Sequence, residues 1–123
     1  MMRNPDAKHL NFADLQGVIP DNPKWLPSNI DMLMERKGKF LLCEWKREGE
    51  EFGGGQKRLL KALAAHPDFT VLIVQGNTDN GMEVQKFWEV CFNQLRFRGG
   101  STAELKLFIR RWYEEVDDKE ISF

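Results

Sequence analysis

Two apolar runs separated by a short polar segment with a glycine constrain the fold of this chain more than any other feature. They lie at about residues 29–35 and 39–47, and the segment between them contains Lys37 and Gly38. This pattern is typical of a β-hairpin, in which a tight turn joins two strands. The sequence therefore predicts an antiparallel strand pair in the first half of the chain.

The predicted turn sets the pairing of charged side chains across the hairpin. If Lys37 and Gly38 form a two-residue loop, counting outward along both strands places Asp31 opposite Glu44. Facing residues of an antiparallel pair have Cβ atoms roughly 4.5–5.5 Å apart, and period-two alternation places Lys46 on the same face as Glu44. Because two carboxylates at this separation repel each other, the arrangement favours a bound divalent cation.

The segments around the hairpin alternate between helical and strand patterns. Residues 6–16 are a short helical candidate that precedes it. A glycine-rich bend at 49–55 leads to an apolar stripe of helical spacing, which opens at Gln56 and ends before Pro67. Residues 69–75 form a continuously apolar, β-branched run, which is typical of a strand buried on both faces.

The last third of the chain predicts further strands and a well-defined helix. Residues 83–97 are rich in β-formers without clean alternation, which indicates one or two strands. Ser101 and Glu104 have the spacing of a capping box, and apolar residues recur at helical spacing over 101–116. We expect an α/β fold in the order α-β-β-α-β-β-α, with a small mixed sheet flanked by helices and a parallel crossover over 39–75.

Length and composition indicate one domain over residues 1–123. Lysine and arginine number 18 against 19 acidic residues, which excludes a strongly basic protein that coats nucleic acid but does not exclude a nuclease. No apolar run approaches the roughly 18 residues of a membrane span, and the N-terminus lacks the apolar segment of a secretory signal. Cys43 and Cys91 lie in apolar runs and are expected to be buried free thiols. These features predict a cytoplasmic protein.

The residues of the hairpin and of the following helix resemble the PD-(D/E)xK nuclease superfamily, which includes restriction endonucleases and resolvases. The matching positions, in chain order, are Asp31, Glu44, Trp45, Lys46 and Gln56. The resemblance covers a core at about 29–75. Within the superfamily, the short form of this chain is similar to Holliday junction resolvases and virus-type replication-repair nucleases. The last third of the chain matches the restriction-endonuclease-like fold only in its element types.

The resemblance implies magnesium-dependent cleavage of DNA. Asp31 and Glu44 would bind Mg²⁺, or Mn²⁺ in its place, together with the main-chain carbonyl of Trp45, because Mg²⁺ prefers oxygen ligands. The ion would polarise the scissile phosphate and lower the pKa of a bound water. Lys46 would hold or deprotonate that water, and Gln56 would orient the water or a phosphate oxygen.

Other residues extend this site or compete with it. Asp21 follows Pro20 in a literal "PD" pair and is therefore a rival to Asp31 as the first metal ligand. Asp31 is preferred because it faces Glu44 across the hairpin, whereas Asp21 lies in a predicted turn. Asp14 or Asp6 could supply a further acid. A basic patch that contacts phosphates is predicted from Arg47, Lys57, Arg58 and Lys61, with a solvated helix face as the alternative.

The site residues also have plainer interpretations, because Glu44 with Lys46 can be a surface pair and Gln56 can serve only as a helix cap. We expect a metal-dependent endonuclease that acts on DNA as a homodimer, with structure-directed or weakly specific cutting. The small size suits a phage or mobile-element enzyme. An inactive nucleic-acid-binding or regulatory protein with the same fold is the alternative. The structure of the preferred substrate stays open.

Overall fold

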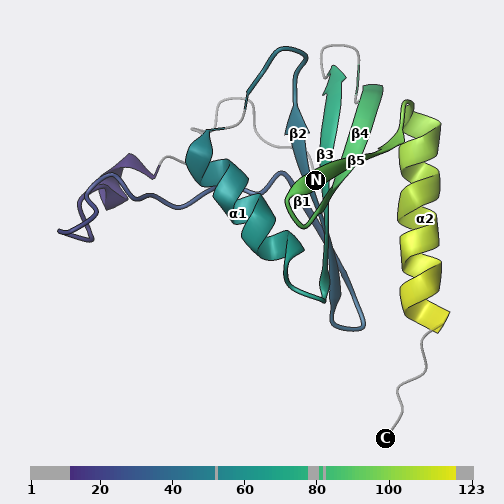
Figure 1. The fold of residues 1–123 in the computed structure, drawn as a ribbon, viewed down its shortest axis with the longest axis horizontal. Coiled ribbons are helices and arrows are strands. Elements are labelled where there is room, and N and C mark those ends of the chain that lie inside the picture. The colour runs from purple at the N-terminus through teal and green to yellow at the C-terminus, as the bar shows by residue number, and fades with distance from the viewer. Residues whose placement is uncertain (1–11, 52, 78–80, 82, 119–123) are drawn as a thin grey trace, which may run out of the picture.

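The computed structural model describes residues 12–51, 53–77, 81 and 83–118, and Figure 1 shows their arrangement. The described chain contains a short 3₁₀ turn, five strands and two α-helices. In chain order these elements are η1 (Ala13–Leu15), β1 (Met32–Arg36), β2 (Lys39–Lys46), α1 (Gly54–Ala64), β3 (Phe69–Asn77), β4 (Glu83–Cys91), β5 (Gln94–Gly99) and α2 (Thr102–Asp118).

The strands form one mixed sheet in the order β1-β2-β3-β4-β5. β2 and β3 are parallel and are joined through α1, while the other neighbouring strands are antiparallel. The two helices pack on opposite faces of the sheet (Figure 1). The protein is therefore a mixed α/β fold, as the sequence predicted. Neither described helix is both long and apolar enough to cross a membrane.

The β1–β2 hairpin has the predicted register. Arg36 pairs with Lys39, and the pairing continues outward to Met32 opposite Cys43. The two turn residues, Lys37 and Gly38, both have positive φ angles, of 52° and 79°. Two-residue turns with positive φ match the twist of the strands that they connect, which fixes the register of the pair.

The face of the sheet under α2, here called the α2 face, carries an apolar core. Its fully or almost fully buried residues from the sheet are Leu41, Cys43, Leu72, Val74, Val84 and Phe87. α2 adds Leu105, with Phe108, Ile109 and Trp112 packed around it. These helix positions recur at a spacing of three to four residues, which places them on one side of a helix.

The opposite face, here called the α1 face, has a smaller core. Leu42, Val71, Ile73 and Val90 are buried there against Leu60 of α1. α1 has 11 residues, whereas α2 has 17. Because the shorter helix covers less of its face, large apolar side chains of β5 stay exposed, with Leu95 at 55% and Phe97 at 60%.

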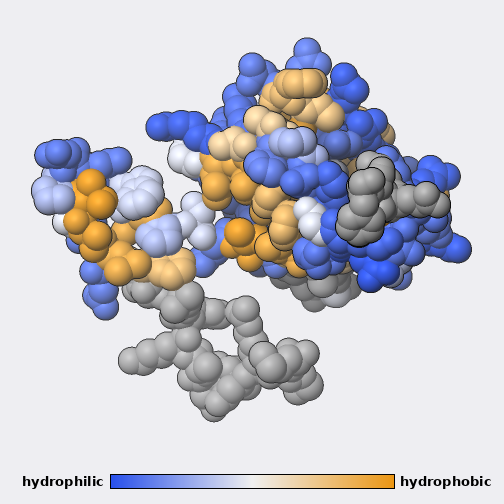
Figure 2. All heavy atoms as spheres, turned by 90° about the horizontal axis from the view of Figure 1, so that it is seen from below, coloured by the Kyte–Doolittle hydropathy of each residue, from blue (hydrophilic) through white to orange (hydrophobic). Residues whose placement is uncertain are grey.

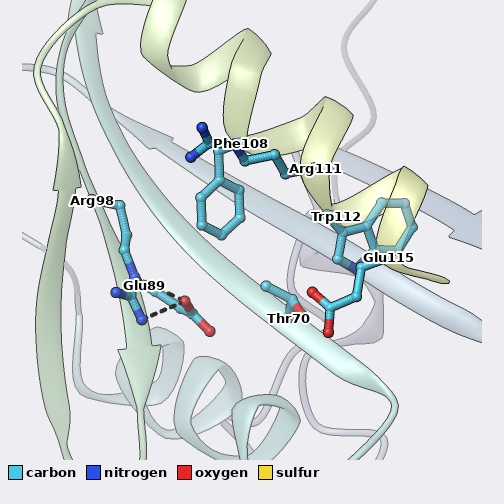
Figure 3. Close-up of a pocket in the computed structure, with 7 residues that line it drawn as sticks. All are labelled: Thr70, Glu89, Arg98, Phe108, Arg111, Trp112 and Glu115. Carbon is cyan, nitrogen blue, oxygen red and sulfur yellow. Dashed lines mark hydrogen bonds and ion pairs between the residues drawn. The ribbon is translucent and has the colours of Figure 1, made fainter.

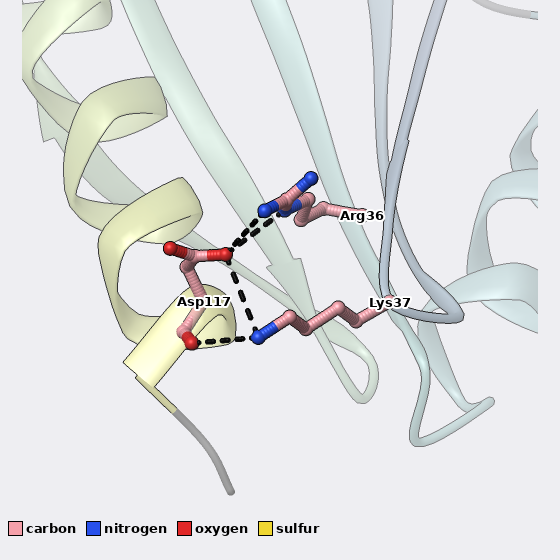
Figure 4. Close-up of polar contacts among 3 residues, drawn as sticks. All are labelled: Arg36, Lys37 and Asp117. Carbon is pink, nitrogen blue, oxygen red and sulfur yellow. Dashed lines mark hydrogen bonds and ion pairs between the residues drawn. The ribbon is translucent and has the colours of Figure 1, made fainter. Parts of the chain in front are cut away.

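α2 is fixed at both of its ends. At the first turn, the Ser101 hydroxyl accepts a hydrogen bond from the backbone N–H of Glu104 at 3.1 Å, as the capping-box spacing predicted. At the last turn, Asp117 accepts hydrogen bonds from the Arg36 guanidinium at 2.6 and 3.0 Å and lies 3.5 Å from the Lys37 ammonium (Figure 4). The Arg36 hydrogen bond lowers the pKa of Asp117. The β1–β2 turn thus holds the end of α2 against the edge of the sheet.

Residues 83–97, for which the sequence left one or two strands open, contain β4 and most of β5. The sheet therefore has five strands, whereas the predicted order α-β-β-α-β-β-α has four. The break between β4 and β5 occurs at Phe92, which has a φ of 56°. A bulky residue rarely adopts this left-handed conformation, which usually favours glycine. Because Phe92 takes the place of a glycine, the sequence did not indicate a turn here. Cys91, beside this turn, is only partly buried, whereas Cys43 is buried as expected.

Several predicted boundaries also shift near the N-terminal half. β1 begins at Met32 rather than near residue 29. α1 begins at Gly54, before Gln56, because two of the bend glycines adopt the first helical turn. Of the predicted helix over 6–16, residues 6–11 lie outside the described residues. The described part, 12–16, contains only the three-residue η1, which is also the only helical element described before the hairpin.

Residues 12–30, here called the N-terminal arm, project from the body of the molecule on the side of α1 (Figure 1). Backbone hydrogen bonds within the arm, such as Gly17 N–H to the Pro23 carbonyl at 2.8 Å, define its shape. Most of its large apolar side chains are exposed, and Figure 2 shows this lobe set apart from the main body. These side chains belong to Leu15, Val18, Ile19, Trp25, Leu26 and Ile30.

Candidate active site

The candidate site lies where β1 ends its pairing with β2. The last backbone pair is Met32 with Cys43, and Asp31 follows opposite Glu44, as the hairpin register predicted. The backbone N–H of Trp45 donates a hydrogen bond to Asp31 Oδ2 at 2.7 Å. In a continuing ladder, this N–H would be bonded to the backbone of the neighbouring strand. The Asp31 side chain therefore replaces the backbone ladder just before the chain enters β1.

A second hydrogen bond joins the two acidic residues in the reverse direction. The backbone N–H of Asp31 donates to Glu44 Oε1 at 3.3 Å. Together with the bond from Trp45, this contact holds both carboxylates at one corner of the sheet. The proximity predicted from the sequence is present in the fold.

Gln56 connects the first turn of α1 to this corner. Its side-chain Nε2 donates to Glu44 Oε2 at 3.0 Å, so both oxygens of Glu44 accept a hydrogen bond. The N-cap residue of α1 is Gly53, which provides no side-chain cap, and the first turn of the helix contains no acidic residue. The free N–H groups and the dipole at a helix N-terminus favour nearby negative charge. Gln56 therefore lies beside Glu44, whereas its predicted role of orienting a water or a phosphate oxygen stays a prediction.

Glu44 is the one buried charged residue of the described chain, with 4% of its surface exposed. It lies two positions after the buried Leu42 and so faces α1 from within the apolar sheet. Burial raises the pKa of Glu44, and the nearby Asp31 carboxylate raises it further. Among the described residues, no lysine, arginine or histidine forms an ion pair with Glu44. A cation would offset both the burial and the repulsion from Asp31.

The atoms at this corner match the oxygen ligands that Mg²⁺ prefers. Two carboxylates are present, and the Trp45 carbonyl points to the same side of β2 as its N–H, which is bonded to Asp31. No group of three or more His, Cys, Asp or Glu side chains within the described part of the chain could hold a metal. Two carboxylates with substrate phosphate and water are nevertheless sufficient for Mg²⁺, which usually keeps several waters.

Lys46 follows Glu44 on the α1 face, as alternation predicted. Its ammonium lies over the ring of Trp88, 5.6 Å from the ring centroid, at a separation suited to a cation–π contact. Trp88 carries no motif that sequence reasoning could have used, and it comes next to Lys46 only because β4 lies beside β3 in the sheet. Trp88 is thus a neighbour of Lys46 that the sequence did not predict. Glu50 and Glu51, which were not predicted for the site either, line the same hollow.

The predicted basic residues line several hollows, and two of them share one. Lys57 lines a hollow together with Lys46 and Trp88, and Arg58 lines a groove that includes Gln56. Lys61 lies further along α1 and lines an apolar hollow together with Lys57. Arg47 lines a separate hollow formed with residues of β3 and β4. The structure thus brings Lys57 and Arg58 close to the site and places the other two around it.

The competing acidic residues lie elsewhere. Asp21 and Asp14 belong to the N-terminal arm, both are exposed, and the arm projects away from the sheet (Figure 1). Asp6 lies outside the described residues. Of the aspartates described, Asp31 is the one that is bonded to Glu44.

The α2 face has a hollow of its own that shares none of the predicted site residues. It has a volume of about 520 Å³ and lies between one flank of α2 and the strands. Figure 3 shows the Glu89–Arg98 ion pair on one side, at 3.0 Å, and the Phe108 ring between this pair and α2. Because Glu89 already pairs with Arg98, this hollow does not repeat the chemistry of the Asp31–Glu44 corner.

Comparison with known proteins adds no assignment to this geometry. No model of a protein family matches the chain, and no curated protein or solved structure shows significant similarity to it.

Proposed function

We propose that the protein is a metal-dependent nuclease that hydrolyses phosphodiester bonds of DNA at the Asp31–Glu44 corner. The observation that carries the proposal is a buried carboxylate, Glu44, that lies against a second carboxylate and has only neutral hydrogen-bond donors. Burying a charge without a partner of opposite charge is costly. A site that keeps such a group is a candidate for a function that uses it, here the binding of Mg²⁺ or Mn²⁺.

The residues around the corner have chemistry that suits this reaction. Asp31, Glu44 and the Trp45 carbonyl would hold the ion, which polarises the scissile phosphate and lowers the pKa of a bound water when it is present. Lys46 would stabilise negative charge that builds up on the phosphate. Gln56, at the first turn of α1, would orient the water or a phosphate oxygen while it holds Glu44 in place.

Metal binding can be tested without any substrate. Mg²⁺ or Mn²⁺ should raise the melting temperature of the wild-type protein, because a ligand that binds only the folded state stabilises it by mass action. Glu44→Gln should abolish this shift, since it removes a charged ligand and keeps the side-chain volume. Glu114→Gln, which changes an exposed residue of α2, is the matched control and should leave the shift intact. An equal shift in Glu44→Gln would place the ion elsewhere.

Cleavage can be tested with labelled duplex, single-stranded, flap and four-way-junction DNA, in Mg²⁺, Mn²⁺ or EDTA. Glu44→Ala and Lys46→Ala should each lower the cutting rate by at least about 100-fold, in the range seen when a group that stabilises a transition state is removed. Cutting that persists in both variants would show that the activity comes from a contaminant. The preferred substrate would define the structure that the enzyme recognises.

A homodimer is a further part of the proposal, because cutting two strands or a four-way junction calls for two sites related by a two-fold axis. Light scattering at micromolar concentration should give twice the chain mass. A monomer that still cuts both strands would contradict this.

The alternative function is a nucleic-acid-binding or regulatory protein that lacks catalysis. The absence of a third acidic side chain at the corner, within the described residues, is the observation that favours it. Such a protein would bind DNA equally well in Mg²⁺ and in EDTA and would cut none of the four substrates.

A further inference from the structure

A groove runs between the end of the N-terminal arm and α1, directly beside the candidate site. It has a volume of about 600 Å³. Trp25, Leu26 and Ile30 line it from the arm, and Gln56, Arg58 and Leu59 line it from α1. Gln56 also donates the hydrogen bond to Glu44, so one residue belongs both to the groove and to the acidic corner.

The arm side of the groove exposes large apolar groups. Trp25 is 62% exposed, Ile30 is 47% exposed and Leu26 is 38% exposed. The Trp25 N–H donates a hydrogen bond to the Asn22 carbonyl at 3.1 Å, which closes a turn before Trp25. A contiguous exposed apolar surface is typical of a binding site.

The polar groups of the groove favour a negatively charged ligand. Arg58 is its one charged residue, and no acidic side chain lines it. The guanidinium folds back toward Gly54, with Nη2 3.5 Å from the position that a Cβ would occupy there. Within the described residues, Arg58 forms neither an ion pair nor a side-chain hydrogen bond. It therefore has its donors available at the end of the groove that adjoins α1's first turn.

We propose that this groove binds one unpaired nucleotide of the nucleic-acid substrate, next to the phosphate that is cleaved. The base would stack against Trp25 and the apolar wall, and Arg58 would contact a backbone phosphate. This inference rests on the proposed function and gives its substrate class: nucleic acid with an unstacked base beside the cut, such as a flap, a junction or a single strand. A base inside a duplex cannot enter, because its two faces are covered by its neighbours.

Binding in EDTA separates this inference from the cleavage reaction. Fluorescence anisotropy would compare a labelled single-stranded oligonucleotide with a blunt duplex of the same length, using the full-length protein. Trp25→Ala should weaken single-strand binding by between about fivefold and about a hundredfold, since stacking of one base on an aromatic ring contributes that much. Duplex binding should stay unchanged. Trp25→Phe, which keeps an aromatic ring, should retain most of the affinity.

Tyr113→Ala is the matched control, because Tyr113 is an exposed aromatic residue of α2 on the other side of the molecule and should leave both affinities unchanged. Trp25 lies outside both core clusters, so Trp25→Ala should keep the wild-type melting temperature. A Trp25→Ala variant that binds single strands as the wild type does, or that loses duplex affinity equally, would overturn the inference.

The two proposals can fail separately. Single-strand binding that depends on Trp25, without metal-dependent cutting of any substrate, would support the groove and contradict the nuclease. Cutting that depends on Glu44, with a full-affinity Trp25→Ala variant, would support the nuclease and contradict the groove. Failure to bind any nucleic acid would contradict both.

Discussion

The two α-helices of this protein begin in opposite ways. The hydroxyl of Ser101, just before α2, caps the backbone N–H of Glu104, and Asp117 in the last turn of α2 is held by the β1–β2 turn. The N-cap residue of α1 is Gly53, which provides no side-chain cap, and the first turn of α1 contains no acidic residue. One helix is thus stabilised at both termini, whereas the other leaves its N-terminal N–H groups without a side-chain partner.

The difference follows the position of each helix relative to the acidic corner. α2 covers the larger core, where an ordinary cap adds stability. α1 begins next to Glu44, and its first turn supplies Gln56 to that carboxylate. A cap side chain there would occupy the N–H groups that favour an anion. Local rules of stability are commonly broken at functional sites, so the weak start of α1 agrees with the site proposed there.

The largest effect should come from the core beneath α2. Phe87 is fully buried and contacts the Phe108 ring edge-on, with centroids 5.9 Å apart. Phe87→Ala should lower the free energy of unfolding by about 3–5 kcal/mol, because it removes buried apolar surface and leaves a cavity. Urea denaturation would measure this. Phe97→Ala, at an exposed position of the α1 face, should lower the free energy of unfolding by less than about 1 kcal/mol. If both variants lost the same free energy of unfolding, the two faces would be packed alike.

Replacing the buried acid on the α1 face should have the opposite sign. The pKa of Glu44 is higher in the folded protein than in the unfolded chain, so the folded state holds its proton more tightly. Stability should therefore fall as the pH rises from about 4.5 through the folded pKa. Without metal, Glu44→Gln should be more stable than the wild type at pH 8, on the order of 1 kcal/mol, and should lose this pH dependence.

Melting temperatures between pH 4 and pH 8 in EDTA would test the Glu44 prediction. Glu114→Gln serves again as the control, because Glu114 is exposed and should keep the wild-type pH profile. A Glu44→Gln variant that is less stable than the wild type at pH 8 would show that the charged form of Glu44 stabilises the fold.

The cap of α2 should have a smaller effect. Ser101→Ala removes the oxygen that accepts the Glu104 N–H and should cost about 1 kcal/mol of unfolding free energy. Ser28→Ala, at an exposed position of the arm, should be close to neutral. If the two variants were equally stable in urea, the capping bond would not contribute to α2.

The smallest effect should come from adding a cap to α1. Gly53 has φ −64° and ψ 160°, and a Cβ there would meet no atom within 4 Å, so serine fits. Gly53→Ser should raise the unfolding free energy by a few tenths of a kcal/mol. It should also weaken DNA binding, because the hydroxyl would compete for the N–H groups. Gly53→Ala, the control, lacks the hydroxyl and should not raise the unfolding free energy. A Gly53→Ser variant that binds DNA more tightly than the wild type would argue against an anion at this helix N-terminus.

The acidic corner shows how far pairing rules reach. Because Lys37 and Gly38 favour a two-residue turn, the sequence sets the whole register and with it the position of Asp31 opposite Glu44. The same counting could not show that the Asp31 side chain replaces the backbone ladder by accepting the Trp45 N–H. That contact depends on where the chain enters the sheet, which the sequence pattern does not show.

Other parts of the molecule were decided by packing between distant segments. The turn at Phe92 contains no glycine that would predict it from the sequence. The division of this segment into β4 and β5 is therefore seen only from the pairing of the two strands. Trp88 reaches Lys46 because β4 packs beside β3. The groove beside Gln56 exists because the arm crosses near α1, and neither segment has a motif that predicts the other.

The sequence by itself thus determined the features that depend on neighbours along the chain: the hairpin register, the cap of α2 and the apolar stripes that place each helix on the sheet. Only the tertiary structure decided the burial of Glu44, the exposure of the arm and which hollows the basic residues line. The physical reason is that local pattern fixes backbone geometry within a turn or a strand pair. Burial and charge environment depend instead on which remote segments come to cover each face.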